Sequence, residues 1–414
     1  MGKKLQSIRG IHDGLPMEVA RWRRVERAAR TIFSRYAFDE VRLPVLESTE
    51  LFVRSIGEAT DIVSKEMYCF EDQGSDHICL RPEGTAGSVR AYLQAGLTRA
   101  GVQRWYYAGP MFRRERPQKG RLRQFQQIGV EMFGVAGPLE DAEVVAMARD
   151  FLAELGLEKV RMELNSLGCP ACRPAYRERL VEYLMTRAAR LCETCNERIS
   201  KNPMRVLDCK TESCQAALTD APEMVHHLCG ECASHFAGVQ EGLDALHVDY
   251  QLNPRIVRGL DYYNRTAFEI ITDQLGAQGT VIAGGRYDGL IEELGGPATP
   301  AIGFAMGIER LAMLLPDEQK SVPDVAVVAL GDSVKGHALK LAAELRGRGV
   351  ATVHCGGGGA KRQFRMADRE GVRFVLVVGD DEMNRSVVTL KQMSTGEQHT
   401  LTLDAAIELI ELNR

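Results

Sequence analysis

The chain has 414 residues, too many for one compact core and enough for two or three domains. Its formal net charge of -4 excludes a polycation, so any contact with nucleic acid must come from local basic patches. The first ten residues lack the apolar stretch of a signal peptide, and no apolar run approaches the length needed to span a bilayer. We therefore expect a cytoplasmic protein without a membrane span.

The first predicted element is an amphipathic helix over residues 17–36. Its apolar side chains recur at helical spacing, and they are Trp22, Val25, Ala29, Ile32, Phe33 and Tyr36. Residues 41–46 then predict a strand, in which Pro44 prevents ordinary ladder pairing. From there to about residue 165, short β-rich runs separated by turn residues predict an antiparallel sheet with a few helices. These runs are residues 67–70, 78–81, 104–108 and 126–133.

The composition changes near residue 165. Residues 166–240 combine clustered cysteines with helical stretches such as residues 176–190, which indicates an insertion. Sheet-like sequence resumes over residues 258–271 and continues to a helix that starts near Gly307.

After Pro316 comes a short polar linker, and strand and helix patterns then alternate. The predicted strands are residues 325–330, 350–354 and 374–378, and the predicted helices between them are residues 334–348 and 361–369. This order predicts a small α/β domain with a substantially parallel sheet. A hairpin that turns at residues 394–397 and a last helix over residues 404–412 complete it.

Residues 113–123 form a strongly basic segment that follows Phe112. They hold six cations and one anion, with Pro117 and Gly120 indicating a loop between two strands and Phe125 resuming the second. The planar fork of an arginine can hold two phosphate oxygens at once, and a neighbouring carboxylate can accept a hydrogen bond from an adenine amino group. A basic loop by itself is more often a solvated hairpin face.

Residues 301–310 are predicted to run from a strand into a helix. Gly303 and Gly307 are expected where the backbone needs room, and Arg310 falls in the first turn of the helix. A cation there is disfavoured by the helix dipole, which suggests an anionic ligand for Arg310. A glycine-rich turn of this kind is common and does not by itself identify a function.

Together these segments resemble the three signatures of class II aminoacyl-tRNA synthetases. The first is the helix that ends in Tyr36-Ala-Phe with Pro44 after it, which builds the dimer interface in that family. The second is Phe112–Glu115 with its loop, and the third is the glycine series that ends in Glu309-Arg310. The resemblance implies a homodimer and an α+β fold, with a six-stranded antiparallel sheet in the catalytic domain.

The resemblance also implies how ATP and tRNA bind. It places Arg113 on the α-phosphate, Glu115 at the adenine amino group, Phe125 against the adenine ring and Arg310 at the γ-phosphate. The loop that contains Arg116, Lys119 and Arg121 would meet the acceptor end of the tRNA.

Three further segments resemble the histidine-specific members of the family. They are residues 81–86, 258–264 and 284–289. A neutral imidazole has one donor and one acceptor, so a selective pocket needs both kinds of partner. Glu131 supplies a carboxylate, and Tyr262, Tyr263 and Tyr287 supply hydroxyls and flat apolar walls.

The same resemblance places Glu83, Thr85 and Gln127 at the ammonium group of histidine. It places Arg258 at the histidine carboxylate and the α-phosphate, where a fixed cation offsets charge that builds up in the transition state. Each of these residues alone has an ordinary structural explanation, and their occurrence together in this order favours the synthetase.

On this resemblance the catalytic domain has two parts, residues 1–165 and residues 251–316. A Cys-rich, mainly helical insertion over residues 166–250 separates them. A linker over residues 317–322 leads to an anticodon-binding domain over residues 323–414.

The expected reaction is ATP-dependent attachment of L-histidine to tRNA(His) through a histidyl-adenylate, with Mg²⁺ accompanying ATP. The alternative is a non-catalytic, synthetase-like regulatory subunit of ATP phosphoribosyltransferase. Such subunits tend to lose the phosphate-binding arginines and the anticodon domain. This chain has Arg113, Arg258, Arg310 and a full carboxy-terminal domain, so we favour the enzyme.

Eight of the eleven cysteines lie in the predicted insertion. Three pairs have the spacing of metal knuckles and a fourth pair is looser; the eight are Cys169, Cys172, Cys192, Cys195, Cys209, Cys214, Cys229 and Cys232. Eight thiols could fill two tetrahedral zinc sites that contribute to folding. Free cysteines also pack well as small apolar side chains, so the sequence leaves a structural zinc open.

Overall fold

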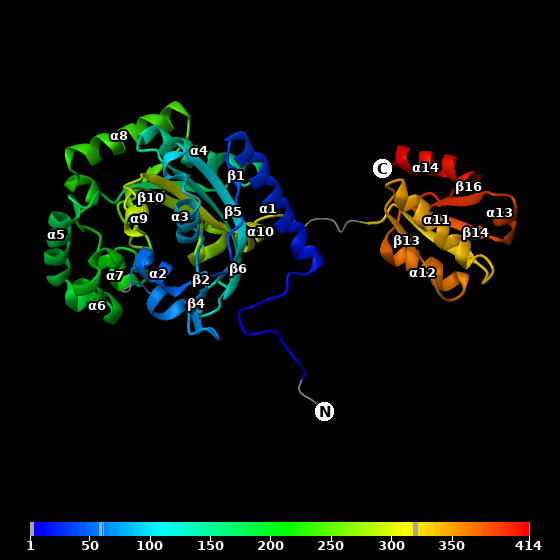
Figure 1. The fold of residues 1–414 in the computed structure, drawn as a ribbon, viewed down its shortest axis with the longest axis horizontal. Helices are drawn as coiled ribbons and strands as arrows, with labels where there is room; N and C mark the ends of the chain where they lie inside the picture. The colour runs from blue at the N-terminus through cyan, green and yellow to red at the C-terminus, as the bar shows by residue number, and fades with distance from the viewer. Residues whose placement is uncertain (1–3, 58–59, 61, 119, 318–321, 414) are drawn as a thin grey trace. The chain divides into compact units, whose positions relative to one another are not determined.

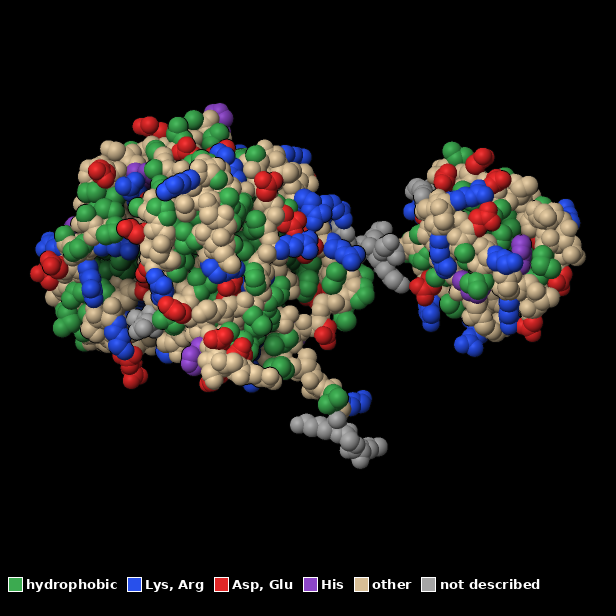
Figure 2. Space-filling view, in the orientation of Figure 1, with side chains coloured by type: hydrophobic (Ala, Val, Ile, Leu, Met, Phe, Trp, Pro, Cys, Tyr) green, Lys and Arg blue, Asp and Glu red, His purple; other side chains and the backbone are tan. Residues whose placement is uncertain are grey.

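The structure is a computed structural model, and it describes residues 4–57, 60, 62–118, 120–317 and 322–413. The chain divides into two compact units, Met1–Glu318 and Gln319–Arg414 (Figure 1). On the face of each unit that Figure 2 shows, acidic and basic side chains are interspersed. None of the described helices is long and apolar enough to cross a membrane.

The larger unit is built on an eight-stranded sheet with the order β1-β5-β6-β11-β10-β9-β7-β8. The six strands from β5 to β7 in this order pair with one another only in antiparallel fashion. The two edge strands, β1 and β8, have two residues each and pair in parallel. The predicted six-stranded antiparallel sheet is therefore confirmed, with a short strand added at each edge. The strands are β1 Asp39–Glu40, β5 Gln103–Phe112, β6 Gln124–Phe133, β7 Arg161–Ser166, β8 Gln251–Leu252, β9 Asn264–Ile271, β10 Thr280–Arg286 and β11 Ala301–Gly307.

Helices α1, Pro16–Arg35, and α4, Pro138–Glu154, pack with α8, Gly230–Ala245, in the main core of the sheet. The predicted first helix is confirmed, and its buried stripe includes Val25, Ala29, Ile32 and Phe33. Phe33 lies against the rings of Tyr106 on β5 and Phe304 on β11. Helical periodicity in the sequence thus identified the face that packs on the sheet.

A second core lies next to the main sheet. It involves a three-stranded antiparallel sheet of order β2-β4-β3 together with α2, Thr49–Ile56, α3, Thr85–Gln94, and α9, Leu290–Glu293. The strands of this sheet are β2 Leu46–Ser48, β3 Tyr68–Glu71 and β4 His77–Leu80.

The predicted strand over residues 41–46 is wrong. The chain pairs before it, in β1, and after it, in β2, but not as a continuous strand. Pro44 has no N–H to give to a ladder. The carbonyl oxygens of Leu43 and Pro44 instead accept hydrogen bonds from Arg81 Nη1, at 2.8 and 3.1 Å.

The cysteine-rich insertion is helical, as predicted. It contains α5 Arg173–Met185, α6 Glu193–Lys201, α7 Glu212–Ala217 and α8, with a short 3-10 helix over Pro203–Val206. Helices α5, α6 and α7 lie together at one side of the larger unit (Figure 1), and the insertion has a core of its own that includes Tyr176 and Leu180. The prediction that sheet structure resumes at Arg258 is wrong, because β9 begins at Asn264 and residues 258–263 form a loop.

The smaller unit has a five-stranded sheet with the order β13-β12-β14-β15-β16. Strand β12 pairs in parallel with β13 and β14, and β15 and β16 add an antiparallel hairpin. Alternate residues of β12 enter two different cores, one with α11 and α14 and the other with α12, so helices cover both faces. The predicted α/β alternation is confirmed. The elements are β12 Val325–Leu330, α11 Lys335–Gly347, β13 Thr352–His354, α12 Ala360–Glu370, β14 Phe374–Gly379, α13 Asp380–Asn384, β15 Val388–Gln392, β16 Gln398–Leu401 and α14 Leu403–Leu412.

Candidate functional site

An open cavity lies on the large antiparallel sheet, with an empty volume of about 910 Å³ including space open to solvent. Its walls come from the β5–β6 hairpin, the start of α3, the loop over residues 258–263, and the strands β10 and β11. Eleven residues singled out in the sequence line it, and they are Glu83, Thr85, Arg113, Glu115, Arg121, Phe125, Gln127, Arg258, Tyr262, Tyr263 and Arg310. Residues that are up to 227 positions apart (83 to 310) therefore meet at one site.

Three of the other predicted residues lie outside the lining of this cavity. Glu131 and Tyr287 are buried beside the cavity: Glu131 accepts a hydrogen bond from Thr85, which lines the cavity, and Tyr287 donates one to Glu131. Arg116 is exposed and is not among the lining residues. Lys119 lies outside the described residues.

Glu131 is the centre of a cluster of hydroxyl groups. Its Oε1 accepts hydrogen bonds from the hydroxyls of Thr85, at 2.7 Å, and Tyr107, at 3.3 Å, and its Oε2 accepts one from the hydroxyl of Tyr287. Burial raises the pKa of Glu131 to about 8, although the three hydroxyl groups lower it in part. The carboxyl group is therefore poised to change its protonation state near neutral pH.

Gly303 is the residue of β11 that pairs with Glu131 of β6. A Cβ atom at this position would lie 2.2 Å from the carbonyl oxygen of Val130 and 2.3 Å from Oε2 of Glu131. Any side chain larger than that of glycine would clash with the Glu131 carboxylate, so the expectation that the backbone needs room at Gly303 is confirmed. At Gly307 it is wrong, because a Cβ there would meet nothing closer than Cγ of Arg310, at 4.0 Å.

Tyr107 is a site residue that the sequence alone did not reveal. It lies on β5 directly opposite Gly129 of β6, and its hydroxyl reaches Glu131. A Cβ atom on Gly84 or Gly129 would lie 2.3 or 2.1 Å from the Tyr107 ring, so both glycines make room for it. The signal in the sequence is a tyrosine and a glycine on two predicted strands, but only the strand register shows that they are opposite each other.

Glu83 caps the amino terminus of α3. Its two carboxylate oxygens accept hydrogen bonds from the backbone N–H groups of Thr85, at 2.6 Å, and Ala86, at 2.9 Å. Burial raises the pKa of Glu83, and the two backbone donors lower it in part. A carboxylate is favourable at this end of a helix, so Glu83 fixes the start of α3 and holds negative charge at the cavity wall.

The loop over residues 258–263 brings a cation and two aromatic rings to the cavity. Arg258 donates from Nη1 to Oε1 of Glu269, at 2.9 Å, and its guanidinium carbon lies 4.8 Å from the centroid of the Tyr263 ring. The ring centroids of Tyr262 and Tyr263 are 4.6 Å apart, and those of Tyr262 and Tyr287 are 5.7 Å apart. The three tyrosines form a flat-walled aromatic corner beside Glu131.

A group of arginines lines the other part of the cavity. Arg113 donates from Nε to the carbonyl oxygen of Pro82, at 2.9 Å, and its guanidinium carbon lies 5.3 Å from the centroid of the Phe125 ring. Arg310 donates to the carbonyl oxygens of Gly120 and Thr280, both at 2.9 Å. Burial lowers the pKa of Arg310, and the like charges of Arg121 and Arg113 lower it further. Cations that repel one another in this way form a site for an anion.

Two carboxylates lie among these arginines. Glu115 Oε2 is 3.5 Å from Nη1 of Arg121. Glu309 accepts a hydrogen bond at Oε1 from the backbone N–H of Gln126, at 2.8 Å, and burial raises its pKa to about 7. Glu309 was part of a recognised segment but was not predicted as a site residue. Only its burial and its position in the cavity wall distinguish it.

Four polar atoms of the cavity residues are buried without a hydrogen-bond partner among the described residues. They are Gln127 Oε1, Arg258 Nε, the Tyr262 hydroxyl and Glu309 Oε2. A buried polar atom without a partner is costly, and native proteins have few of them. Their concentration in one cavity indicates that a polar ligand supplies the missing partners.

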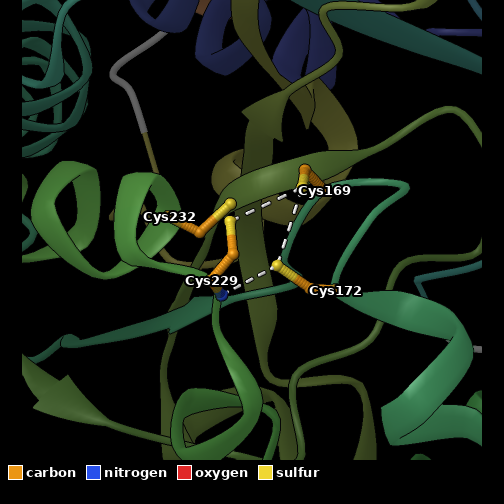
Figure 3. A group of neighbouring side chains, drawn as sticks. All are labelled: Cys169, Cys172, Cys229 and Cys232. Atoms are coloured by element: carbon orange, nitrogen blue, oxygen red, sulfur yellow. Dashed lines mark hydrogen bonds between the residues drawn. The ribbon is translucent and has the colours of Figure 1, made fainter.

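The eight cysteines of the insertion form two separate groups of four. Cys169 and Cys172 meet Cys229 and Cys232 (Figure 3). The sulfur atoms of each group lie within 4.8 Å of one another. The second group is Cys192, Cys195, Cys209 and Cys214. All eight are free thiols. The sequence showed the pairs, and the structure shows which pairs combine.

One thiol of the first group, Cys169, and two of the second, Cys192 and Cys209, have a pKa below the ordinary value. Burial raises the pKa of Cys169, but hydrogen bonds from the backbone of Cys172 and Ala171 outweigh this and hold the pKa at about 7. Burial likewise opposes ionisation of Cys209, but hydrogen bonds from the hydroxyl and backbone of Thr211 bring its pKa to about 7. Thiolates, which are the form that binds metal, are thus accessible at neutral pH.

Both units match known families. The histidyl-tRNA synthetase family model matches residues 10–311, and the anticodon binding domain model matches residues 324–413. The histidine–tRNA ligase of Trichlorobacter lovleyi is 50% identical over 405 residues, which cover 97% of each chain. That of Aquifex aeolicus is 49% identical over 401 residues, which cover 96% of this chain and 99% of the relative.

Solved structures agree with these matches. Apo histidyl-tRNA synthetase from S. aureus has a TM-score of 0.81 and 35% identity, covering 99% of this chain and all of that one. A structure from Bacillus halodurans, described as an ATP phosphoribosyltransferase regulatory subunit/histidyl-tRNA synthetase, has a TM-score of 0.67 and 20% identity and covers 92% of this chain. At that identity the second likeness concerns the fold alone.

Proposed function

The chain belongs to the histidyl-tRNA synthetase family, and we propose that it attaches L-histidine to tRNA(His) through a histidyl-adenylate formed from ATP. The resemblance inferred from the sequence is confirmed. The carboxy-terminal unit matches an anticodon-binding domain, and relatives about half identical over nearly the whole length are histidine–tRNA ligases. The alternative of a non-catalytic regulatory subunit lacking that domain is therefore not supported.

The observation that carries the proposal is the set of four buried polar atoms without partners in one cavity. Tyr262 packs on Tyr287, which donates to Glu131, and Gln127 lies on β6 four residues before Glu131, whereas Glu309 is next to Arg310; the missing partners therefore belong to a ligand with two polar ends. Arg258 lies on the loop between them. An amino acid that reacts with a nucleotide fits this division.

Histidine occupies the end of the cavity near Glu131. The Glu131 carboxylate accepts from the imidazole N–H, and the tyrosine rings flank the ring. Gln127, Thr85 and Glu83 hold the ammonium group, with Gln127 Oε1 as an acceptor that has no other partner among the described residues. Apolar side chains of similar size are rejected because they would leave these buried groups unpaired.

ATP occupies the arginine-lined end. Phe125 stacks on the adenine, Glu115 accepts from its amino group, Arg113 holds the α-phosphate and Arg310 the γ-phosphate. Mg²⁺ binds ATP mainly through phosphate oxygens and water, so it requires few protein ligands. The Glu309 carboxylate fits that requirement, because its Oε2 is buried beside the arginines with no partner in the described chain. When bound, the ion neutralises charge on the phosphates.

Positioning and charge stabilisation account for the chemistry. The histidine carboxylate attacks the α-phosphorus in line, pyrophosphate leaves, and Arg113 and Arg258 offset the charge that develops on the transferred group. The 3′-hydroxyl of the tRNA then attacks the anhydride carbonyl and releases AMP. Arg116, Lys119 and Arg121 meet the acceptor end of the tRNA, and residues 323–414 bind its anticodon.

We also propose that each cysteine group holds a structural zinc ion. Tetrahedral zinc with Zn–S bonds of about 2.3 Å requires sulfur atoms roughly 3.8 Å apart. Cys169 Sγ lies 3.6 Å from Cys172 Sγ and 3.9 Å from Cys229 Sγ, and Cys192 Sγ lies 3.9 Å from Cys209 Sγ. The spacing fits zinc and is far too long for disulfides, which need about 2.05 Å.

We propose the remaining assignments on the resemblance to the family. The catalytic domain comprises residues 1–165 and 251–316, the insertion residues 166–250 and the linker residues 317–322. The enzyme acts in the cytoplasm as a homodimer. The interface uses α1 and the segment through Pro44, and Leu46 just beyond it is 48% exposed in the single chain. Sedimentation equilibrium distinguishes the dimer from a monomer.

ATP–pyrophosphate exchange, measured separately with each of the twenty amino acids, tests the proposed function. Exchange that depends on histidine alone supports it, and charging of tRNA(His) with labelled histidine extends the test to the second step. Binding of histidine without any exchange or charging would instead favour the regulatory alternative.

A further inference from the structure

The loop over residues 258–263 has almost no support from the sheet that it adjoins. Among the described residues, no backbone–backbone hydrogen bond joins residues 257–263 to another part of the chain. The loop nevertheless carries Arg258, Tyr262 and Tyr263 into the cavity wall. Its conformation must therefore be fixed by side chains that come from elsewhere.

Those side chains come from the cysteine-rich insertion. Arg205 donates from Nη1 to the carbonyl oxygen of Arg258, at 3.1 Å. Asn202 donates from Nδ2 to Oδ1 of Asp261, also at 3.1 Å. Arg173 donates to the carbonyl oxygen of Tyr263. The start, the middle and the end of the loop are thus each held by one side chain of the insertion.

Apolar packing joins the same two parts. Val257, the residue before Arg258, is 9% exposed and belongs to the core of the insertion, with Tyr176 and Leu180. Met204, next to Arg205, packs against both that core and the core that contains Tyr262 and Tyr263. The loop therefore has its backbone toward the insertion and its functional side chains toward the cavity.

The two cysteine groups adjoin the three holding residues. Arg173 follows Cys172 directly and its backbone N–H donates to the carbonyl oxygen of Cys169, at 3.2 Å. Asn202 follows the helix that carries Cys195, and Arg205 lies in the short helix that precedes Cys209. The cysteine groups therefore define the places from which the loop is held.

We propose that Arg173, Asn202 and Arg205 of the insertion are positioning residues for the amino-acid site, which they serve by holding the Arg258–Tyr263 loop. This rests on the proposed function, since it takes the cavity end at Tyr262 and Tyr263 to bind histidine. The insertion then supports the first step of the reaction, in addition to any contact that it makes with tRNA. ATP binding depends on it much less, because the three hydrogen bonds go to the loop, whereas Arg113 directly follows β5, Phe125 lies on β6 and Arg310 lies on α10, Ile308–Ala312.

Arg205→Ala is the most direct test, because Arg173 lies beside a cysteine group and its loss would disturb that group too. The dissociation constants of histidine and of ATP are measured by calorimetry on the full chain, and hydrogen exchange is followed in residues 257–263. A hydrogen bond from a charged donor is worth roughly a 10-fold change in an equilibrium constant. We expect histidine to bind roughly 10-fold more weakly, ATP to bind within about 2-fold of the original chain, and the loop to exchange faster.

Three companion variants make the result specific. Arg205→Lys keeps a donor in reach of the Arg258 carbonyl and should restore most of the histidine affinity. Asn202→Ala removes an exposed contact and should give a smaller effect of the same kind, which keeps the test available if Arg205→Ala does not fold. Arg179→Ala removes an exposed arginine of the same insertion, whose one ion-pair partner in the described part of the chain is Glu182 at 3.5 Å, and should change nothing.

Unchanged histidine affinity and unchanged loop exchange in a folded Arg205→Ala protein would overturn the inference, as would an equal loss of histidine and ATP binding. The unsubstituted chain separates this failure from a failure of the proposed function. If it binds no histidine, the proposed function is wrong; if it binds histidine and Arg205→Ala binds it equally well, only the positioning role is wrong.

Discussion

Asp141 and Arg286 form an ion pair in which neither side chain has exposed surface. Arg286 Nε lies 3.1 Å from Asp141 Oδ2, and the same carboxylate accepts from Thr266, at 2.6 Å, and lies 2.9 Å from His235 Nε2. One carboxylate thus ties α4 to β9, β10 and α8. Arg286 also donates to Asp288, so the residues on both sides of Tyr287 are fixed.

Arg286→Met should destabilise the protein strongly, because it leaves the Asp141 carboxylate buried with its main counter-charge removed. Breaking a buried pair in this way typically costs about 3–5 kcal/mol. Denaturant unfolding measures the change. Arg161→Met is the matched control, since its pair with Glu163 is only partly buried, with 40% of the Arg161 side chain exposed, and ion pairs near the surface contribute about 0–1 kcal/mol. Similar losses in the two variants would contradict the structural role given to Arg286.

Arg258→Ala should slow formation of the adenylate by roughly 10²–10³-fold while the fold is retained, because the guanidinium is proposed to act at the reacting centre. ATP–pyrophosphate exchange under saturating substrates measures the rate. Arg161→Ala provides the comparison, because Arg161 lies on β7, next to β9, and is not among the residues that line the cavity. Exchange near the original rate in purified Arg258→Ala would place this residue outside the chemistry.

Glu131→Gln should weaken histidine binding more than ATP binding, since only the imidazole is proposed to meet this side chain. An amide retains the shape but gives an acceptor without charge, and its N–H₂ group opposes the donors that now surround the carboxylate. Calorimetric titration with each substrate gives the two affinities. If both fall by the same factor, Glu131 acts on the site as a whole and not on the imidazole.

The raised pKa of Glu131 also predicts how stability depends on pH. In the folded chain its pKa is about 8, above the ordinary 4.5, so the folded state binds the proton more tightly than the unfolded state. The contribution of the Glu131 carboxyl group to the free energy of unfolding is therefore fully present at a pH below its ordinary pKa of 4.5. It is lost as the pH rises through about 8. Without ligand, the free energy of unfolding of the original chain relative to Glu131→Gln should fall between about pH 5 and about pH 8. A difference that stays constant over this range would show that Glu131 is not held protonated.

The cysteine groups predict two zinc ions per chain in protein purified without chelators. Removing the metal should raise hydrogen exchange first in α5, α6 and α7, because metal binding is part of the folding free energy of that region. Cys195→Ser should lose one zinc ion, while Cys355→Ser, which changes a buried cysteine outside both groups, should keep both. Metal-free protein with unchanged exchange in these helices would mean that the thiols are only packed.

Local patterns in the sequence determined many of the helices and strands of this protein and the family to which it belongs. Helical periodicity gave α1, apolar runs gave β12 and β14, and the basic and glycine-rich segments together with residues 258–264 and 284–289 indicated the family. These features could be recognised because each is complete within a short stretch of chain, where spacing alone decides which side chains share a face. The same locality explains the errors at residues 41–46 and at 258–263, where contacts with Arg81 and with the insertion replaced the expected strand pairing.

Only the tertiary structure decided which distant residues meet. Strand register set Tyr107 opposite Gly129 and Glu131 opposite Gly303, and a shift of one residue would turn these side chains to the other face of the sheet. Chain folding decided that Cys169 and Cys172 join Cys229 and Cys232, and that Arg205 reaches Arg258. The raised pKa of Glu131 likewise follows from burial between elements that are distant in the chain, which outweighs the lowering by three hydroxyl groups. Such contacts depend on burial and on packing between elements, which no single stretch of sequence contains.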